Sequence, residues 1–204
     1  MLKPVPDSDP MGGMRPLLEQ DDALTGYEPE NYPDNCWVLH AAYRGADRVL
    51  WRDEVTSMGQ SWEAWQRNPN WRVLQGRFRS PEAIAPSEGQ PDRQSLARLV
   101  KVLARHSAEG LDTECYWAQA YVEDLVRPTV VAHEGALREG VAHYDICEDP
   151  HSGVSLKFPA QWWAKDQSWY VLTDWDMSAT QVFGDQSLIL DLLADDWLEA
   201  VRLP

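Results

Sequence analysis

The chain has 204 residues, with 33 Asp and Glu against 18 Lys and Arg, a formal net charge of −15 at pH 7. A hydrophobic share of 44% and a charged share of 25% are ordinary for a globular protein, so the composition excludes wholesale disorder. No segment approaches the ~20 apolar residues of a membrane-spanning helix. The first residues lack the apolar run of a secretory signal peptide. We therefore expect a cytoplasmic protein without membrane contact.

The predicted elements begin after an acidic, proline-rich arm. Residues 1–33 hold six of the 14 prolines and the Gly12-Gly13 pair, which favours irregular structure. Residues 34–204 contain no linker long enough to divide them, so we predict a single domain there. Its first strand is predicted over 36–43 and its first helix over 51–58, where the apolar residues have helical spacing.

Two longer helices are predicted further along the chain. One covers 92–108, with Asp92 as its N-cap and apolar residues spaced along one face, and the other begins after a second cap at Asp185. Short strands are predicted over 114–122, 129–133, 143–147, 169–176, 180–183 and 198–203. Strands grouped between helices indicate an α+β fold, a mostly antiparallel sheet with two or three packed helices.

The negative charge is concentrated in the second half of the chain. Residues 1–102 hold 12 Lys and Arg against 15 Asp and Glu, whereas residues 103–204 hold 6 against 18. Such a surface repels phosphates, which disfavours direct nucleic-acid binding, and it attracts a protein with a basic surface. The alternative that the negative charge serves only to keep the protein soluble stays open. The outer face of the predicted 92–108 helix carries Arg93, Arg98, Lys101 and Arg105. These side chains can face the acidic half of the chain or solvent, and we expect solvent.

The cysteines and histidines do not form a recognisable metal site. Cys36, Cys115 and Cys147 are far apart, none has CxxC spacing, and apolar neighbours favour a core position for each. His133 and His143 are predicted on neighbouring strands and so close together, but no third ligand is identified. We therefore predict neither a metal nor another cofactor.

One segment of the second half has a specific pattern. Residues 159–176 read PAQWWAKDQSWYVLTDWD. They resemble a signature, WW-x2-D-x2-W-x3-TD-x-D, of a group of uncharacterised actinobacterial proteins, and the resemblance extends over most of the chain after about Gly26. One departure is Phe183-Gly184-Asp185, where the group usually shows two glycines. The resemblance implies a single bacterial cytoplasmic domain, and it implies no activity.

The same segment supplies a pair of candidate functional carboxylates. Asp174 and Asp176 alternate on the predicted strand, so both point to one face at a spacing of ~7 Å. Such a pair can share a divalent cation or act as acid and base, and Asp166 can join it across a turn. This pattern supports an enzyme or a small-ligand binder with a tryptophan-lined pocket.

Three functions remain open from the sequence. The first is an acidic protein-binding domain, for example an immunity-type inhibitor of a basic toxin; the second is the enzyme or ligand binder; the third is a structural subunit of a complex. No P-loop, dinucleotide-binding glycine pattern or nucleophile elbow is present, so we assign no catalytic residue. The oligomeric state is left open. The candidate partner- or ligand-binding residues are Asp166, Asp174, Asp176, Trp163, Asp195, Asp196 and Trp197.

Overall fold

The computed structural model describes residues 2–4, 29, 32–70, 83–121, 129–148, 158–173 and 177–203. This part of the chain is dominated by an eight-stranded sheet in the order β1-β7-β6-β8-β9-β10-β2-β11, in which all neighbouring strands are antiparallel. Its strands are β1 (Lys3–Pro4), β2 (Asp34–Leu39), β6 (Glu114–Tyr121), β7 (Thr129–Ala136), β8 (Gln161–Ala164), β9 (Tyr170–Leu172), β10 (Ala179–Gly184) and β11 (Glu199–Val201).

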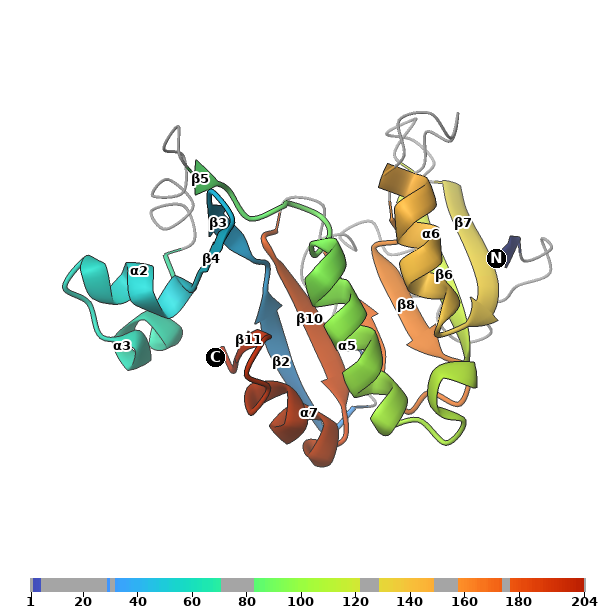
Figure 1. Cartoon of the computed structure of the whole chain (residues 1–204). Coiled ribbons are helices and arrows are strands. Elements are labelled where there is room, and N and C mark those ends of the chain that lie inside the picture. The colour runs from blue at the N-terminus through green and yellow to red at the C-terminus, as the bar shows by residue number, and fades with distance from the viewer. Residues whose placement is uncertain are drawn as a thin grey trace.

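Shorter elements complete the described fold. A three-stranded sheet has the order β4-β3-β5, and it lies beside two short helices at one end of the main sheet (Figure 1). The remaining elements are β3 (Ala42–Arg44), β4 (Asp47–Val49), β5 (Ala83–Ile84), α2 (Trp51–Ser57), α3 (Trp62–Arg67), α5 (Arg93–Arg105), the 3-10 turn η1 (Gly110–Asp112), α6 (Glu139–Glu148) and α7 (Gln186–Leu193). The predicted α+β class is confirmed.

The main core lies between one face of the large sheet and the helices α5, α6 and α7, which all lie over that face (Figure 1). From α5, Leu96, Leu99 and Leu103 are completely buried. Beneath the helices, Trp117 of β6 and Trp162 of β8 stack with ring centroids 4.8 Å apart. Because large aromatic side chains remove the most apolar area from water, these two tryptophans make the centre of the sheet a major source of stability.

The opposite face of the sheet carries a second layer of aromatic residues. Trp163, Tyr170 and Phe183 come from β8, β9 and β10 and are almost completely buried. Trp163 and Tyr170 stack with centroids 5.9 Å apart. At the end of this face, α2 and α3 pack Trp51 and Trp65 against the strands β2 and β11. Among the described residues, no helix other than these two packs on this face.

The first turn of α2 is held by a residue from the far end of the chain. Its N-cap, Leu50, has no side-chain oxygen to accept the free N–H groups of the helix. The carboxylate of Glu199 instead accepts hydrogen bonds from the N–H of Trp51 at 2.7 Å and of Arg52 at 2.9 Å. Both N–H groups belong to the first turn, where backbone donors have no partner within the helix. The carboxylate from β11 therefore acts as a long-range cap and fixes the position of α2.

The local signals of the sequence located most of these elements. The helix predicted over 51–58 is α2, and the two caps are confirmed. Asp92 accepts from the N–H of Gln94 and of Ser95 at 3.0 and 3.1 Å, and Asp185 accepts from the N–H of Leu188 at 2.7 Å. The strands predicted over 114–122, 129–133, 180–183 and 198–203 correspond to β6, β7, β10 and β11, with small differences at their ends.

The strand predicted over 143–147 is wrong, because these residues lie inside α6. The core-facing residues of this region, Leu137, Val141 and Tyr144, have helical spacing. Gly140 interrupts that pattern because it has no side chain. A Cβ there would lie 2.4 Å from Cη2 of Trp117, so the glycine lets the helix approach the sheet closely.

Two further predictions differ from the structure. The strand predicted over 36–43 is two strands, because the chain leaves the large sheet after Leu39 and forms a hairpin from Ala42 onward. Within the N-terminal arm, most of which lies outside the described residues, Lys3–Pro4 pairs with β7 as an edge strand instead of being irregular.

Candidate functional site

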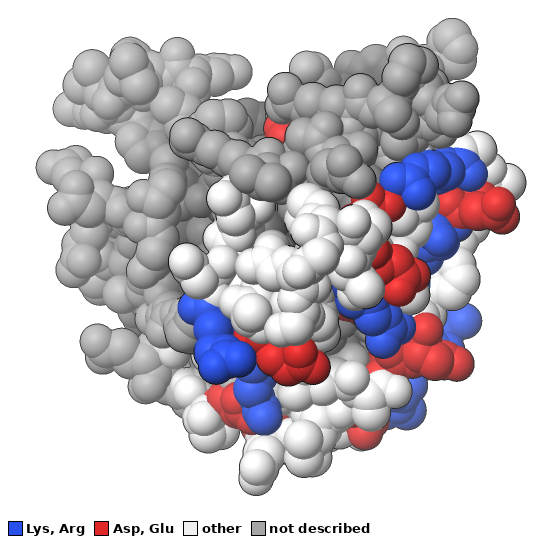
Figure 2. Space-filling view, turned by 90° about the vertical axis from the view of Figure 1, so that its left-hand side faces the viewer, with Lys and Arg blue, Asp and Glu red and all other residues white. Residues whose placement is uncertain are grey.

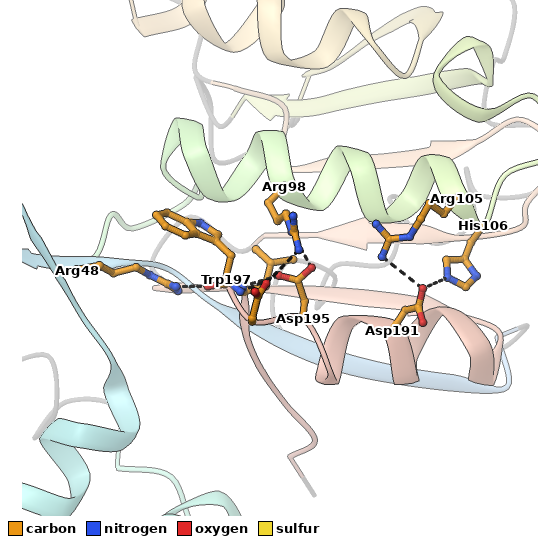
Figure 3. A network of polar contacts seen from close by, with 9 residues as sticks. Arg48, Arg98, Arg105, His106, Asp191, Asp195 and Trp197 are labelled. Atoms are coloured by element: carbon orange, nitrogen blue, oxygen red, sulfur yellow. Dashed lines mark hydrogen bonds and ion pairs between the residues drawn. The ribbon is translucent and has the colours of Figure 1, made fainter.

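Three of the sequence-predicted site residues lie together after α7. Asp195, Asp196 and Trp197 connect this helix to β11 and pack beside α5, whose Arg98 reaches them (Figure 3). This group, together with Arg48 of β4, is called the Asp195 cluster below. Its geometry is defined by the contacts of Arg98 with the two aspartates and of Arg48 with Trp197. Two hydrogen bonds from backbone N–H groups to the Asp195 carboxylate complete it.

Asp195 is the buried anchor of the cluster. Its side chain is only 2% exposed. It accepts hydrogen bonds from Nε of Arg98 at 2.7 Å and from the N–H of Trp197 and of Leu198, both at 2.9 Å. Burial alone would raise the pKa of Asp195, but the hydrogen bonds from Leu198, Arg98 and Trp197 outweigh it and lower that pKa. Asp195 therefore holds the loop in place and presents no free carboxylate.

Asp196 is the outward member of the cluster. Its side chain is 92% exposed, and one of its oxygens lies 3.1 Å from Nη2 of Arg98. An exposed ion pair of this kind contributes little to stability. The Asp196 carboxylate is therefore accessible to a partner, unlike that of Asp195.

Trp197 joins the cluster to the small sheet. The guanidinium of Arg48 lies 5.0 Å from the centroid of the Trp197 ring, and Arg48 also donates a hydrogen bond to the Trp197 carbonyl. Such cation–π contacts are attractive when the ring face is partly desolvated. The buried indole N–H of Trp197 and Nε of Arg48 have no hydrogen-bond partner among the described residues.

A second polar network lies about two turns further along α5, at its C-terminal end. Asp191 of α7 accepts from Arg105 at 3.3 Å and lies 2.9 Å from Nε2 of His106 (Figure 3). The hydrogen bond with His106 is the main cause of the lowered pKa of Asp191. The arginines of α5 therefore pair with α7 and its following loop, and Arg93 pairs with Asp145 of α6. Of the two positions considered for this basic face, contact with the acidic half of the chain is therefore found, although the three arginine side chains stay 40–57% exposed.

Two other predicted site residues lie elsewhere on the sheet. Trp163 is 4% exposed and belongs to the aromatic layer on the face opposite α5. Asp166 lies in the turn between β8 and β9, where it accepts from the N–H and hydroxyl of Ser168 at 3.0 and 2.7 Å. Strand β8 is separated from β11 by three strands, which places these residues apart from the Asp195 cluster. The predicted pair Asp174 and Asp176 lies outside the described residues.

One buried row of hydrogen-bonded side chains was not predicted from the sequence. His40, between β2 and β3, has Nδ1 2.6 Å from the Ser87 carbonyl and Nε2 2.8 Å from the Thr180 hydroxyl. Since a carbonyl only accepts, Nδ1–H donates to Ser87 and Nε2 accepts from Thr180, whose oxygen lies 2.8 Å from that of Thr173. Burial lowers the pKa of His40 to about 4. His40, Thr173 and Thr180 are at most 2% exposed, so this row of side chains is structural, and no sequence spacing signals it.

Basic and acidic side chains are not segregated on the one face of the molecule shown in Figure 2. On the face that carries α2 and α3, Lys and Arg side chains alternate with Asp and Glu across the described surface (Figure 2). Among the described residues, no group of three or more His, Cys, Asp or Glu is arranged to hold a metal ion. No helix in the described part of the chain is long and apolar enough to cross a membrane.

Comparison with known proteins gives no further identification: no protein-family model, no curated protein and no solved structure matches this chain.

Proposed function

We propose that the chain is a cytoplasmic binding protein for a partner with a basic surface, with an immunity-type inhibitor of a basic toxin as its concrete form. The observation that carries this proposal is the excess of carboxylates over cations. With 33 acidic and 18 basic side chains, 33 − 18 = 15 carboxylates stay unneutralised even if every cation pairs with one of them. An excess of this size attracts a basic partner and speeds its association.

Among the described residues, we place this contact on the segment from α7 to β11. Residues 185–196 contain four aspartates and no Lys or Arg. Arg98 and Arg105 of α5 pair with three of these aspartates, Asp191, Asp195 and Asp196, so the segment offers a partner mainly the exposed carboxylate of Asp196. The Asp196 side chain is 92% exposed, and Leu190 of α7 is 50% exposed. An accessible apolar side chain among carboxylates suits a partner that combines basic and apolar groups. Asp195 and Trp163 are not part of this proposed surface, because both are buried.

The test has two stages. Immobilised full-length protein is first used to capture partners from extracts of its native host at low and moderate salt. The association rate of the captured protein is then measured by surface plasmon resonance at two ionic strengths. We expect the rate to fall as salt increases, because steering between unlike charges is screened.

A pair of charge reversals localises the contact. Asp196→Lys should slow association several-fold. Glu63→Lys on the exposed start of α3 changes the net charge equally and should slow it less. Failure to capture any protein, or association that does not depend on salt, would contradict the proposed function. Equal effects of the two substitutions would remove the α7–β11 segment from the proposal.

A further inference from the structure

His133 and His143 face one another at the end of the main core. His133 lies on β7 and His143 on α6, so a strand and the helix packed over it each supply one imidazole. The two ring centroids are 5.8 Å apart, and the ring planes are tilted by 46°. Both side chains are half-buried. The sequence predicted the proximity of the two histidines but placed both on strands.

Within the described part of the chain, both imidazoles have the properties of available metal ligands. Neither forms a hydrogen bond or an ion pair with another described residue. Burial lowers the pKa of His133, and burial together with the neighbouring His133 lowers the pKa of His143. Both rings are therefore neutral at pH 7, and a neutral imidazole has the free nitrogen lone pair that binds a metal.

The separation of the rings fits joint coordination of one ion. At a zinc–nitrogen distance of about 2.0–2.1 Å, each ring centroid lies roughly 3.2 Å from the metal. Two such rings at a tetrahedral angle have centroids about 5.2 Å apart. The observed 5.8 Å differs by roughly half an ångström, a change that rotation about the side-chain bonds can provide without moving β7 or α6.

We propose that His133 and His143 form an open two-imidazole site for a divalent transition-metal ion of the nickel–copper–zinc group, the ions that imidazole ligands favour. Water completes the coordination, since the described residues offer no third ligand. The site is independent of the proposed partner-binding surface. This proposal differs from the prediction made from the sequence, which was that the protein binds no metal because no third ligand accompanies the two histidines.

The test uses the full chain without a polyhistidine tag and Zn²⁺ as the probe. Calorimetric titration should give one ion per chain. In proton–nitrogen correlation spectra of the histidine rings, Zn²⁺ should shift the signals of His133 and His143 together and leave His106 in place. This spectrum is recorded on the unmodified protein, so it does not depend on whether a variant folds. Shifts at one ring only, or at neither, would overturn the proposal.

Substitutions provide the second readout. His133→Asn and His143→Asn should each weaken Zn²⁺ binding at least tenfold, because each removes one of only two protein ligands. His106→Asn is the matched control, since it removes a histidine paired with Asp191, and it should leave the affinity unchanged. Thermal unfolding in chelator confirms that each variant is folded. Zn²⁺ binding of unchanged strength in the double variant H133N/H143N would show that the ion binds elsewhere and would overturn the proposal.

Discussion

Glu199 accepts a hydrogen bond at 2.7 Å from the backbone N–H of Trp51, a residue 148 positions earlier in the chain. The carboxylate replaces the local cap that Leu50 cannot provide, and it is itself buried. Burial raises the pKa of Glu199 in spite of the hydrogen bonds from Arg52 and Trp51. The position of α2 on the sheet therefore depends on one acidic residue of the last strand.

Removal of this long-range cap should destabilise the protein. Glu199→Ala leaves two helix N–H groups without an acceptor, and we expect a loss of about 1–2 kcal/mol in the free energy of unfolding. Glu199→Gln retains one acceptor oxygen in a side chain of the same size and should lose less. Urea unfolding at pH 7 measures both. Equal stability of the alanine variant and the unsubstituted protein would show that Glu199 does not act as a cap.

Asp195 and Asp196 are adjacent in sequence but should respond very differently to substitution. Asp195→Ala removes a buried acceptor of three hydrogen bonds and leaves Arg98 without its main partner. We expect it to cost about 2 kcal/mol or more. Asp196→Ala removes an exposed ion pair and should cost less than ~0.5 kcal/mol. Urea unfolding of the two variants side by side checks the difference, and similar losses would contradict the assigned roles.

Gly140 should not tolerate a larger residue although it lies in a helix. On helix propensity alone, Gly140→Ala would stabilise the protein by ~1 kcal/mol. The new Cβ would, however, lie 2.4 Å from the ring of Trp117. That ring is stacked on Trp162 and completely buried, so we expect a net loss of about 1–3 kcal/mol. Thermal unfolding gives the sign, and a higher melting temperature for the variant would contradict the close approach of α6 to the sheet.

His40 should make stability depend on pH. Its pKa is lowered to about 4 in the folded protein by burial, whereas an unfolded histidine titrates near 6.5. Between these values the unfolded chain binds more protons than the folded one, so stability falls as pH decreases from about 6.5 to 4. Across this whole pH range, the expected loss in the free energy of unfolding is roughly 3 kcal/mol.

The matched variant for this effect is His40→Asn, which cannot titrate. It is less stable at pH 7 because it breaks the hydrogen bonds with Ser87 and Thr180. Its stability should nevertheless depend less on pH than that of the unsubstituted protein. Urea unfolding of both proteins at several values between pH 4 and 7 isolates the contribution of His40, because the carboxylates titrate in both. Parallel pH profiles would contradict the assignment.

The elements that are easiest to predict from the sequence are those stabilised by residues close to them in the chain. Asp92 and Asp185 cap helices two or three residues away, so short windows reveal them. Strand β8 was missed because all four of its residues are buried and no polar alternation marks them. Helix α6 was mistaken for a strand because Gly140 hides its apolar face. In both cases the decisive factor is the packing of a distant element.

The candidate site was harder to predict for the same reason. The ion pair between Arg98 and Asp195 joins residues 97 positions apart, and no spacing rule connects them. The proximity of Asp195 to Trp197 was evident from the chain, but which of the neighbouring aspartates is buried was not. The contact of Arg48 with Trp197 likewise depends on how the small sheet is placed against β11.

The position of β11 bears on how the protein forms during synthesis. Strand β2 is made early, but its outer neighbour in the sheet comes from the last residues described. Its other neighbour, β10, is also made late, so β2 has both sides unpaired during most of translation. Until Glu199 has been made, the N–H groups of Trp51 and Arg52 in α2 lack their carboxylate acceptor. The nascent chain can assemble this end of the sheet only after residue 199 has been released from the exit tunnel, so truncated translation products should be recognised by chaperones and proteases.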